Sequence, residues 1–166
     1  MKRIKVIFKQ HRQDNFTLNE GKDVLIICTS DQGLSDTLMT TNVFNILKKR
    51  AITPPEETFD LLHFAIGLYV IDQVYSRKAF GFQGWSRYFE IYVPVTKPGL
   101  WQEIKEELEN TLSFLSGDRW ILHFRELIKE EKQLKIPEEK QASKIDKVAL
   151  FSGGMDSFIG AIDYLE

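Results

Sequence analysis

The sequence predicts an α+β domain over residues 1–130 and, after a charged linker at 131–146, the beginning of an α/β domain at 147–166. Three observations support this prediction. Segments that alternate apolar and polar side chains, which is typical of half-buried strands, occur among segments with the periodicity of helices. The two kinds of segment follow one another in mixed order, which fits α+β better than strict βαβ alternation. A glycine-rich turn then lies between a last apolar strand and a last helix.

Two strands and a short helix are predicted in the first part of the chain. Ile4, Val6 and Phe8 alternate with basic residues, as expected for a half-buried strand. Residues 23–30 (DVLIICTS) are apolar on both faces, and we therefore expect this strand to be the more central of the two. The polar segment between them reads as a loop, and a short helix is predicted near 42–49.

A long buried helix is predicted to follow. Thr53 can cap it, and Glu56 stands three residues later, as in a capping box. The two prolines between these residues suit the first turn of a helix. The body of the helix, residues 57–76, is apolar over most of its circumference, which indicates a position in the middle of the domain.

The second half of the domain is predicted to contribute two further strands with a helix between them. The first strand, at 86–95, places four apolar side chains on one face: Phe89, Ile91, Val93 and Val95. The helix begins near Pro98, stops at Gly117 and buries a stripe of Leu100, Trp101, Ile104, Leu108, Leu112 and Leu115. The last strand, at 118–127, directs three side chains inward: Trp120, Leu122 and Phe124.

Two features of this domain have more than one interpretation. Asp60 and Asp72 on the long helix could form a polar pair at a substrate surface, but hydrogen bonds to neighbouring loops are the favoured interpretation. The glycine-broken aromatic loop at 80–85 could bind a partner protein. We expect instead that it folds back on the long helix.

Composition indicates a cytoplasmic protein. Of the 166 residues, 43% are hydrophobic and 28% are charged, and the formal net charge is −2 at pH 7. This charge gives no reason to expect direct binding of nucleic acid. The longest apolar run, residues 64–71, is far shorter than a membrane span, so no membrane association is expected. No continuous apolar stretch follows the basic start, as it would in a signal peptide.

Metal ligands are scarce in the sequence. His11, His63 and His123 lack ligand spacing and read as ordinary surface or core residues. Cys28 is the single cysteine, so the chain has neither an internal disulfide nor a cysteine zinc cluster of its own.

The segment after the linker has the pattern of a phosphate-binding loop. A short apolar strand at 147–151 leads into S-G-G-M-D-S, after which a helix begins. Glycines let the backbone approach an anion closely, and the amides of the loop and of the helix N-terminus would point at it. A carboxylate beside a phosphate is expected to cap the helix or to hold a magnesium ion. The residues expected to form this site are Ser152, Gly153, Gly154, Asp156 and Ser157.

This motif resembles the PP-loop of the ATP pyrophosphatase superfamily, whose domains have the adenine nucleotide α-hydrolase-like fold. Its five fixed residues would match by chance in a chain of this length only about once in several thousand sequences. The resemblance implies that ATP and magnesium bind at Ser152–Ser157 and that ATP is cleaved between its α and β phosphates. The adenylate would then activate a carbonyl or carboxylate.

Residues 60–78, 85–95 and 112–124 precede the motif in a pattern that resembles the N-terminal part of QueC-like proteins of bacterial antiphage defence operons. These proteins are relatives of 7-cyano-7-deazaguanine synthase. The resemblance implies an AMP-forming ligase that adenylates a 7-deazaguanine carboxylate in antiviral defence, with a protein partner from the same operon. Zinc ligands and the deazaguanine pocket of the family lie downstream of the PP-loop. We therefore expect this chain to be the N-terminal portion of a longer enzyme and to be inactive alone.

Other functions stay open at this point. Another PP-loop enzyme, such as a tRNA-modifying or amidotransferase type, is an alternative to the QueC-like ligase. A non-catalytic protein-binding module would fit the first domain. A nucleotide sensor without turnover is a third interpretation.

Overall fold

The computed structural model of the chain describes residues 2–10, 14–18, 24–28, 37–38, 43–50 and 54–128. They belong to two units, of which the first holds all of the described strands and helices α2 to α5. The second holds most of helix α1 (Val43–Lys49), which confirms the short helix predicted near 42–49. The predicted linker at 131–146 and the segment at 147–166 lie outside the described residues.

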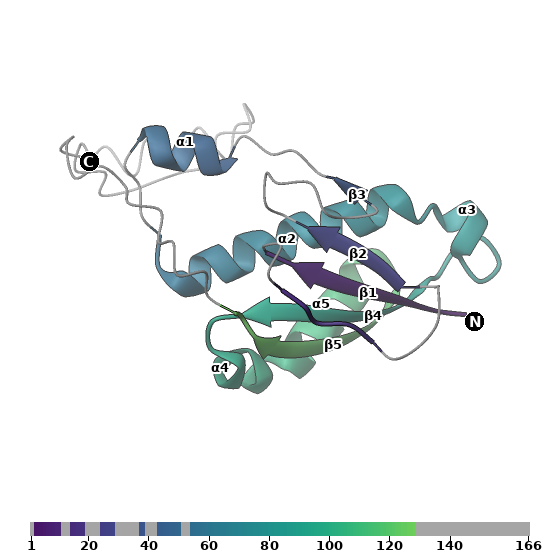
Figure 1. Cartoon of the computed structure of the whole chain (residues 1–166). Coiled ribbons are helices and arrows are strands. Elements are labelled where there is room, and N and C mark those ends of the chain that lie inside the picture. The colour runs from purple at the N-terminus through teal and green to yellow at the C-terminus, as the bar shows by residue number, and fades with distance from the viewer. Residues whose placement is uncertain are drawn as a thin grey trace, which may run out of the picture. The chain divides into compact units, whose positions relative to one another are not determined.

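Five strands form one parallel sheet in the first unit, in the order β3-β2-β1-β4-β5 (Figure 1). The strands are β1 (Arg3–Lys9), β2 (Val24–Cys28), β3 (Thr37–Leu38), β4 (Tyr88–Val95) and β5 (Arg119–Glu126). The chain builds this sheet outward from β1, first to one side and then to the other. β1 is therefore the central strand, and the prediction that residues 23–30 would be more central was wrong.

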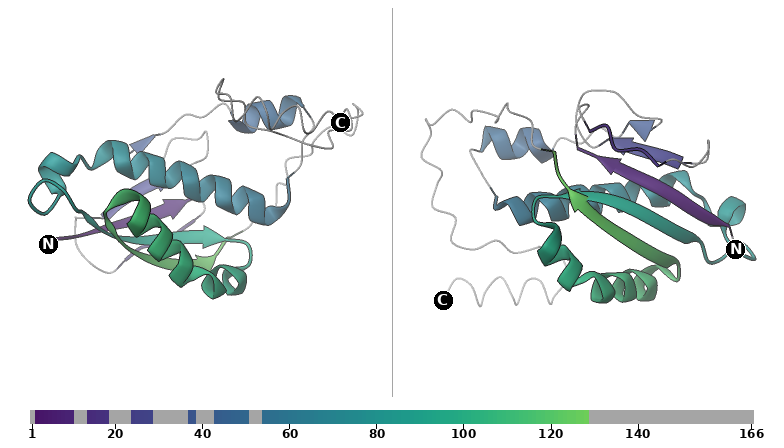
Figure 2. Two further views of the ribbon diagram at one scale, coloured as in Figure 1. Left: turned by 180° about the vertical axis from the view of Figure 1, so that it is seen from behind. Right: turned by 60° about the horizontal axis from the view of Figure 1, so that its bottom comes forward.

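Helices α2 (Glu56–Val74), α4 (Pro98–Glu103) and α5 (Lys105–Ser116) cover one face of the sheet, here called the helical face (Figures 1 and 2). The predicted mixture of helices and strands is confirmed. The preference for α+β over βαβ order needs correction, because β4, α4–α5 and β5 form a βαβ unit with parallel strands. Alternating strand faces misled the prediction, since a parallel sheet with helices on one face alternates too.

The hydrophobic core lies between the sheet and these helices. The inward residues predicted for the strands are buried there, namely Ile4, Val6, Phe8, Phe89, Ile91, Val93, Val95, Trp120 and Leu122. The ring of Phe64 on α2 is a common contact, with centroid distances of 6.5, 6.2 and 6.4 Å to the rings of Phe8, Trp101 and Phe124. These contacts join α2 and α4 to the sheet through one aromatic cluster.

The start of the long helix differs from the prediction. α2 begins at Glu56, and Pro55 precedes it without a side-chain cap. The prolines therefore stand before the helix rather than in its first turn. The predicted cap, Thr53, lies outside the described residues.

The helix predicted from Pro98 to Gly117 is divided in two. It breaks at Ile104, whose φ of −100° and ψ of 7° depart from helical values. The predicted buried stripe is wrong in part. Trp101 is buried and Leu108 and Leu112 pack on the core, whereas three members of the stripe are exposed: Leu100, Ile104 and Leu115.

The outer edge of β5 is partly closed by a side chain of α5. The N–H groups of Arg119 and Leu127 donate to carbonyls beside or in β4, so the N–H of Leu122, which lies between them in alternate register, points away from β4. This N–H donates to Glu109 Oε1 at 2.7 Å. A carboxylate thus occupies the middle of the sheet edge.

The environment of α2 keeps its histidine uncharged. Burial lowers the pKa of His63 to about 4, so this side chain is uncharged at neutral pH, as expected for a core histidine. None of the described helices is long and apolar enough to cross a membrane.

Close packing of α2 on β1 predicts that Gly67→Ala destabilises the protein. A Cβ at Gly67 would lie 2.4 Å from two ring carbons of Phe8, and both residues are buried. We expect a loss of about 1–3 kcal/mol in the free energy of unfolding, measured by urea denaturation. Gly99→Ala is the control, because a Cβ at Gly99 meets no atom within 4 Å. Equal denaturation midpoints for the two variants would contradict this packing.

Candidate functional site

The five residues predicted to hold ATP phosphates, Ser152, Gly153, Gly154, Asp156 and Ser157, lie outside the described residues. The structural candidates therefore come from the first unit. Two polar clusters stand out there: an arginine–aspartate network at the beginnings of β4 and β5, and a carboxylate cluster on the sheet face opposite the helical face.

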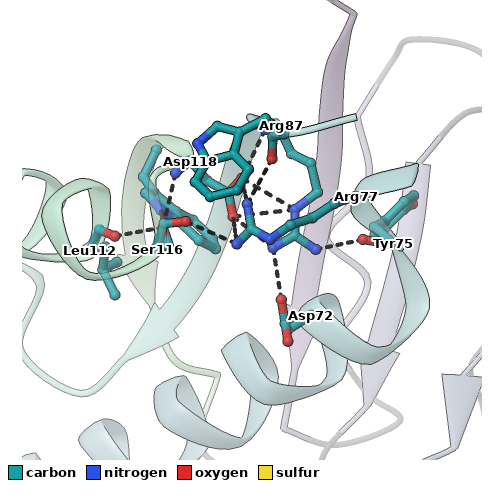
Figure 3. A network of polar contacts seen from close by, with 9 residues as sticks. Asp72, Tyr75, Arg77, Arg87, Leu112, Ser116 and Asp118 are labelled. Atoms are coloured by element: carbon teal, nitrogen blue, oxygen red, sulfur yellow. Dashed lines mark hydrogen bonds and ion pairs between the residues drawn. The ribbon is translucent and has the colours of Figure 1, made fainter. Parts of the chain in front are cut away.

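The network is centred on the ion pair between Arg87 and Asp118 (Figure 3). Arg87 Nη2 lies 2.6 Å from Asp118 Oδ2, and Arg87 Nε lies 3.2 Å from both carboxylate oxygens. The side chains are 2% and 0% exposed. Arg87 also donates to Asp72 Oδ1 at 2.7 Å and to the carbonyl of Tyr75. Burial alone would lower the pKa of Arg87, but its hydrogen bonds to Asp118 and Asp72 outweigh it and raise that pKa.

A second arginine ties an aromatic loop to this carboxylate. Arg77, in the one-turn helix α3 (Arg77–Phe80), donates to Asp118 Oδ1 at 2.8 Å and Oδ2 at 3.1 Å. It also donates to the carbonyl of Trp85 at 2.8 Å and to that of Ser116 at 2.9 Å. The loop 81–86 and the end of α5 are therefore held together through one guanidinium group.

The two segments joined by Arg77 expose large apolar side chains. Trp85 is 71% exposed and Phe82 is 58% exposed, while Phe114 and Leu115 at the end of α5 are 88% and 74% exposed. We call these four residues the aromatic patch. The predicted folding of the loop onto the long helix holds for Phe80, whose ring lies 4.8 Å from that of Tyr75, but not for the patch.

The second cluster lies on the other face of the sheet, where Glu90 accepts three polar contacts. Tyr92 Oη and His123 Nε2 lie 3.1 and 3.0 Å from Glu90 Oε1. Arg3 Nη1 lies 3.1 Å from Oε2, and the Glu90 side chain is 9% exposed. Burial alone would raise the pKa of Glu90, but these hydrogen bonds outweigh it and lower that pKa below its usual value. Glu90 is thus an ionised carboxylate at neutral pH.

Residues 14–18 lie on this face against the second halves of β4 and β5. Asp14 is buried and pairs with Arg125, whose guanidinium carbon lies 4.5 Å from the centroid of the Phe16 ring. Phe16 in turn lies 5.7 Å from the ring of Tyr92. This segment covers the ends of β4 and β5 and leaves their beginnings uncovered by it.

The structure decides the interpretation of the aspartates on α2. Asp60 accepts from the backbone N–H and the hydroxyl of Thr96 at 2.8 and 2.7 Å, and Asp72 binds Arg87. Both aspartates bond to segments next to the helix, which confirms the favoured interpretation of hydrogen bonds to neighbouring loops. No group of three metal-ligating side chains occurs in the part of the chain that the structure describes.

Sequence reasoning missed the residues of both clusters. Asp118 and Arg87 each stand directly before a strand and belong to no recognised motif. Glu90 could have been noticed, because it is a carboxylate within an otherwise apolar and aromatic strand. Two of its partners, Arg3 and His123, come from β1 and β5, and no spacing in the sequence connects them with Glu90.

Comparison of the chain with protein-family models, with curated proteins and with solved structures found no match.

The buried pair predicts unequal effects for two aspartate substitutions. Asp118→Asn leaves Arg87 buried beside a neutral group, and we expect a loss of about 3–5 kcal/mol in the free energy of unfolding. Asp72→Asn is the matched control, because Asp72 is 59% exposed and such pairs contribute about 1 kcal/mol or less. Thermal and urea unfolding measure both. A cost for Asp118→Asn no larger than that for Asp72→Asn would contradict the central role of the pair.

Proposed function

We propose that this chain belongs to a QueC-like, ATP-dependent ligase and that Ser152–Ser157 form its PP-loop. The observation that carries the proposal is the sequence S-G-G-M-D-S between an apolar strand pattern and a helix pattern. In the described part, a sheet unit of its own precedes the motif, which fits a domain placed before the nucleotide-binding segment. The reaction would join an adenylated 7-deazaguanine carboxylate to an amine in antiviral defence.

The donor set of the motif suits an ATP phosphate with magnesium. Gly153 and Gly154 would let backbone N–H groups approach the phosphate, and the hydroxyls of Ser152 and Ser157 would donate to its oxygens. Asp156 would hold the magnesium ion that offsets the charge of the phosphates. These residues would bind and orient ATP.

Binding of nucleotide tests this proposal directly. We expect the purified chain to bind Mg·ATP in isothermal titration, and Gly154→Ala to weaken binding at least about tenfold, because a Cβ would obstruct backbone approach to the phosphate. Gly99→Ala is the matched control and should bind like the unaltered chain. Equal affinity of the Gly154 variant, or no binding of ATP at all, would overturn the proposal.

A second candidate function, a protein-binding module, is favoured by the aromatic patch. Exposed tryptophan and phenylalanine side chains on a firmly held loop are typical of interface hot spots. The partner would be a protein, expressed from the same operon, that offers an apolar surface to Phe82 and Trp85. The network around Arg77 would keep the loop in one conformation, which lowers the entropy lost on binding.

The affinity of patch variants for the partner protein tests whether the aromatic patch is a binding surface. We expect replacement of Phe82 and Trp85 by serine to weaken binding to the operon partner at least about tenfold in biolayer interferometry. Tyr69→Ser is the matched control, because Tyr69 is also 58% exposed but lies on α2 outside the patch. If the control weakens binding as much as the patch variant does, the patch is not the interface.

A further inference from the structure

The sheet face opposite the helical face, here called the polar face, carries a local excess of positive charge. The strand register places twelve side chains of β1, β4 and β5 on it: Arg3, Lys5, Ile7, Lys9, Tyr88, Glu90, Tyr92, Pro94, Arg119, Ile121, His123 and Arg125. Basic residues outnumber the single carboxylate of this set by five to one, although the whole chain has a net charge of −2. Two of the five are paired with carboxylates, Arg125 with Asp14 and Arg3 with Glu90. The net charge of the whole chain therefore does not reveal the positive charge of the polar face.

Two arginines are held on one tyrosine ring at the beginning of these strands. The guanidinium carbons of Arg3 and Arg119 lie 5.0 and 5.3 Å from the centroid of the Tyr88 ring. Register explains the arrangement, because Arg3 and Arg119 are the direct neighbours of Tyr88 on β1 and β5. The hydrogen bond to Glu90 raises the pKa of Arg3 and fixes its orientation.

Arg119 keeps its hydrogen-bonding capacity toward a ligand. It is exposed, and the one contact of its side chain given by the described part of the structure is with the ring of Tyr88. A guanidinium has five N–H donors in a planar fork, the geometry that matches a phosphate. A ring contact orients the Arg119 fork without using its donors, whereas Arg3 already donates through Nη1 to Glu90. The remaining N–H groups of the two arginines form what is here called the clamp, which would donate to an oxyanion.

A stack of aromatic rings ends on the same face. The rings of Tyr92 and His123 lie 4.6 Å apart and only 13° from parallel. Among the described strands β5 is the last in the sheet order, so within this part of the chain no strand lies beside the ring face of His123 that is turned away from Tyr92. The His123 side chain is 39% exposed. A planar base could extend this stack by one ring.

We propose that this part of the polar face binds a nucleotide unit, with Arg3 and Arg119 holding its phosphate and His123 stacking on its base. Arg119 and His123 lie on the same strand, four residues apart, which is roughly 13 Å along a strand. The unit can be a free nucleotide or part of a single strand, and it is distinct from the ATP proposed to bind at Ser152–Ser157.

Thymine ligands test this proposal, because they lack the adenine that a PP-loop site would take. Fluorescence anisotropy with a labelled thymidine decamer is measured at low salt, and thymidine monophosphate is the competitor. We expect Arg119→Gln to weaken binding about tenfold and His123→Ala about fivefold or more. Lys78→Gln, an exposed basic residue on α3, and Gly154→Ala are the controls and should bind like the unaltered chain. Circular dichroism verifies that each variant is folded.

The results of the anisotropy experiment distinguish the two kinds of ligand and can overturn the proposal. Displacement of the decamer by the monophosphate supports a site for one nucleotide, and binding of the decamer without displacement supports a site for a strand. Failure of the unaltered chain to bind either ligand overturns the proposal. So does an equal loss for Arg119→Gln and Lys78→Gln, because binding would then follow overall charge rather than this clamp.

Discussion

The first unit depends on one buried carboxylate, that of Asp118, which two arginines and a backbone amide approach. Its oxygens accept from Arg87, from Arg77 and from the backbone N–H of Arg87. The same residue follows Gly117, whose φ of 70° turns the chain out of α5. A buried ion pair contributes little net stability over an apolar pair, but it disfavours other arrangements of the chain, because they would leave a buried charge without its partner. Here it fixes which residue of β5 lies beside β4, and a slip by one residue would exchange the two faces of the strand.

The two faces of the sheet perform different tasks as a result. One face supplies the apolar side chains that pack against α2, α4 and α5, and so stabilises the unit. The other presents charged and aromatic groups in rows set by strand pairing rather than by loops. Side chains on neighbouring strands are held at fixed separations, so Arg3, Tyr88 and Arg119 are arranged before any ligand arrives. Such preorganisation is what a binding site requires.

Local patterns predicted the elements well and their assembly less well. The alternation of Phe89, Ile91, Val93 and Val95 identified β4 and its buried face, since period and burial are properties of one segment. Parallel pairing and the central place of β1 arise from contacts between distant segments, which no local pattern encodes. The break at Ile104 is of the same kind, because helical periodicity continues through it. The clusters around Asp118 and Glu90 combine residues from three or more elements and were missed for this reason, whereas the contiguous motif at 152–157 was recognised but lies outside the described residues.

The carboxylate of Glu109 at the edge of β5 has a consequence for assembly. A sheet that ends in an unpaired strand is a template on which further strands can add, from a second molecule or from an aggregate. Glu109 already uses the N–H of Leu122, and its negative charge would face the carbonyl oxygens of any incoming strand. An added strand would have to displace the Glu109 side chain, and the carboxylate would then lose its hydrogen bond from the N–H of Leu122. The helix that packs against the core thus also protects the sheet from uncontrolled growth.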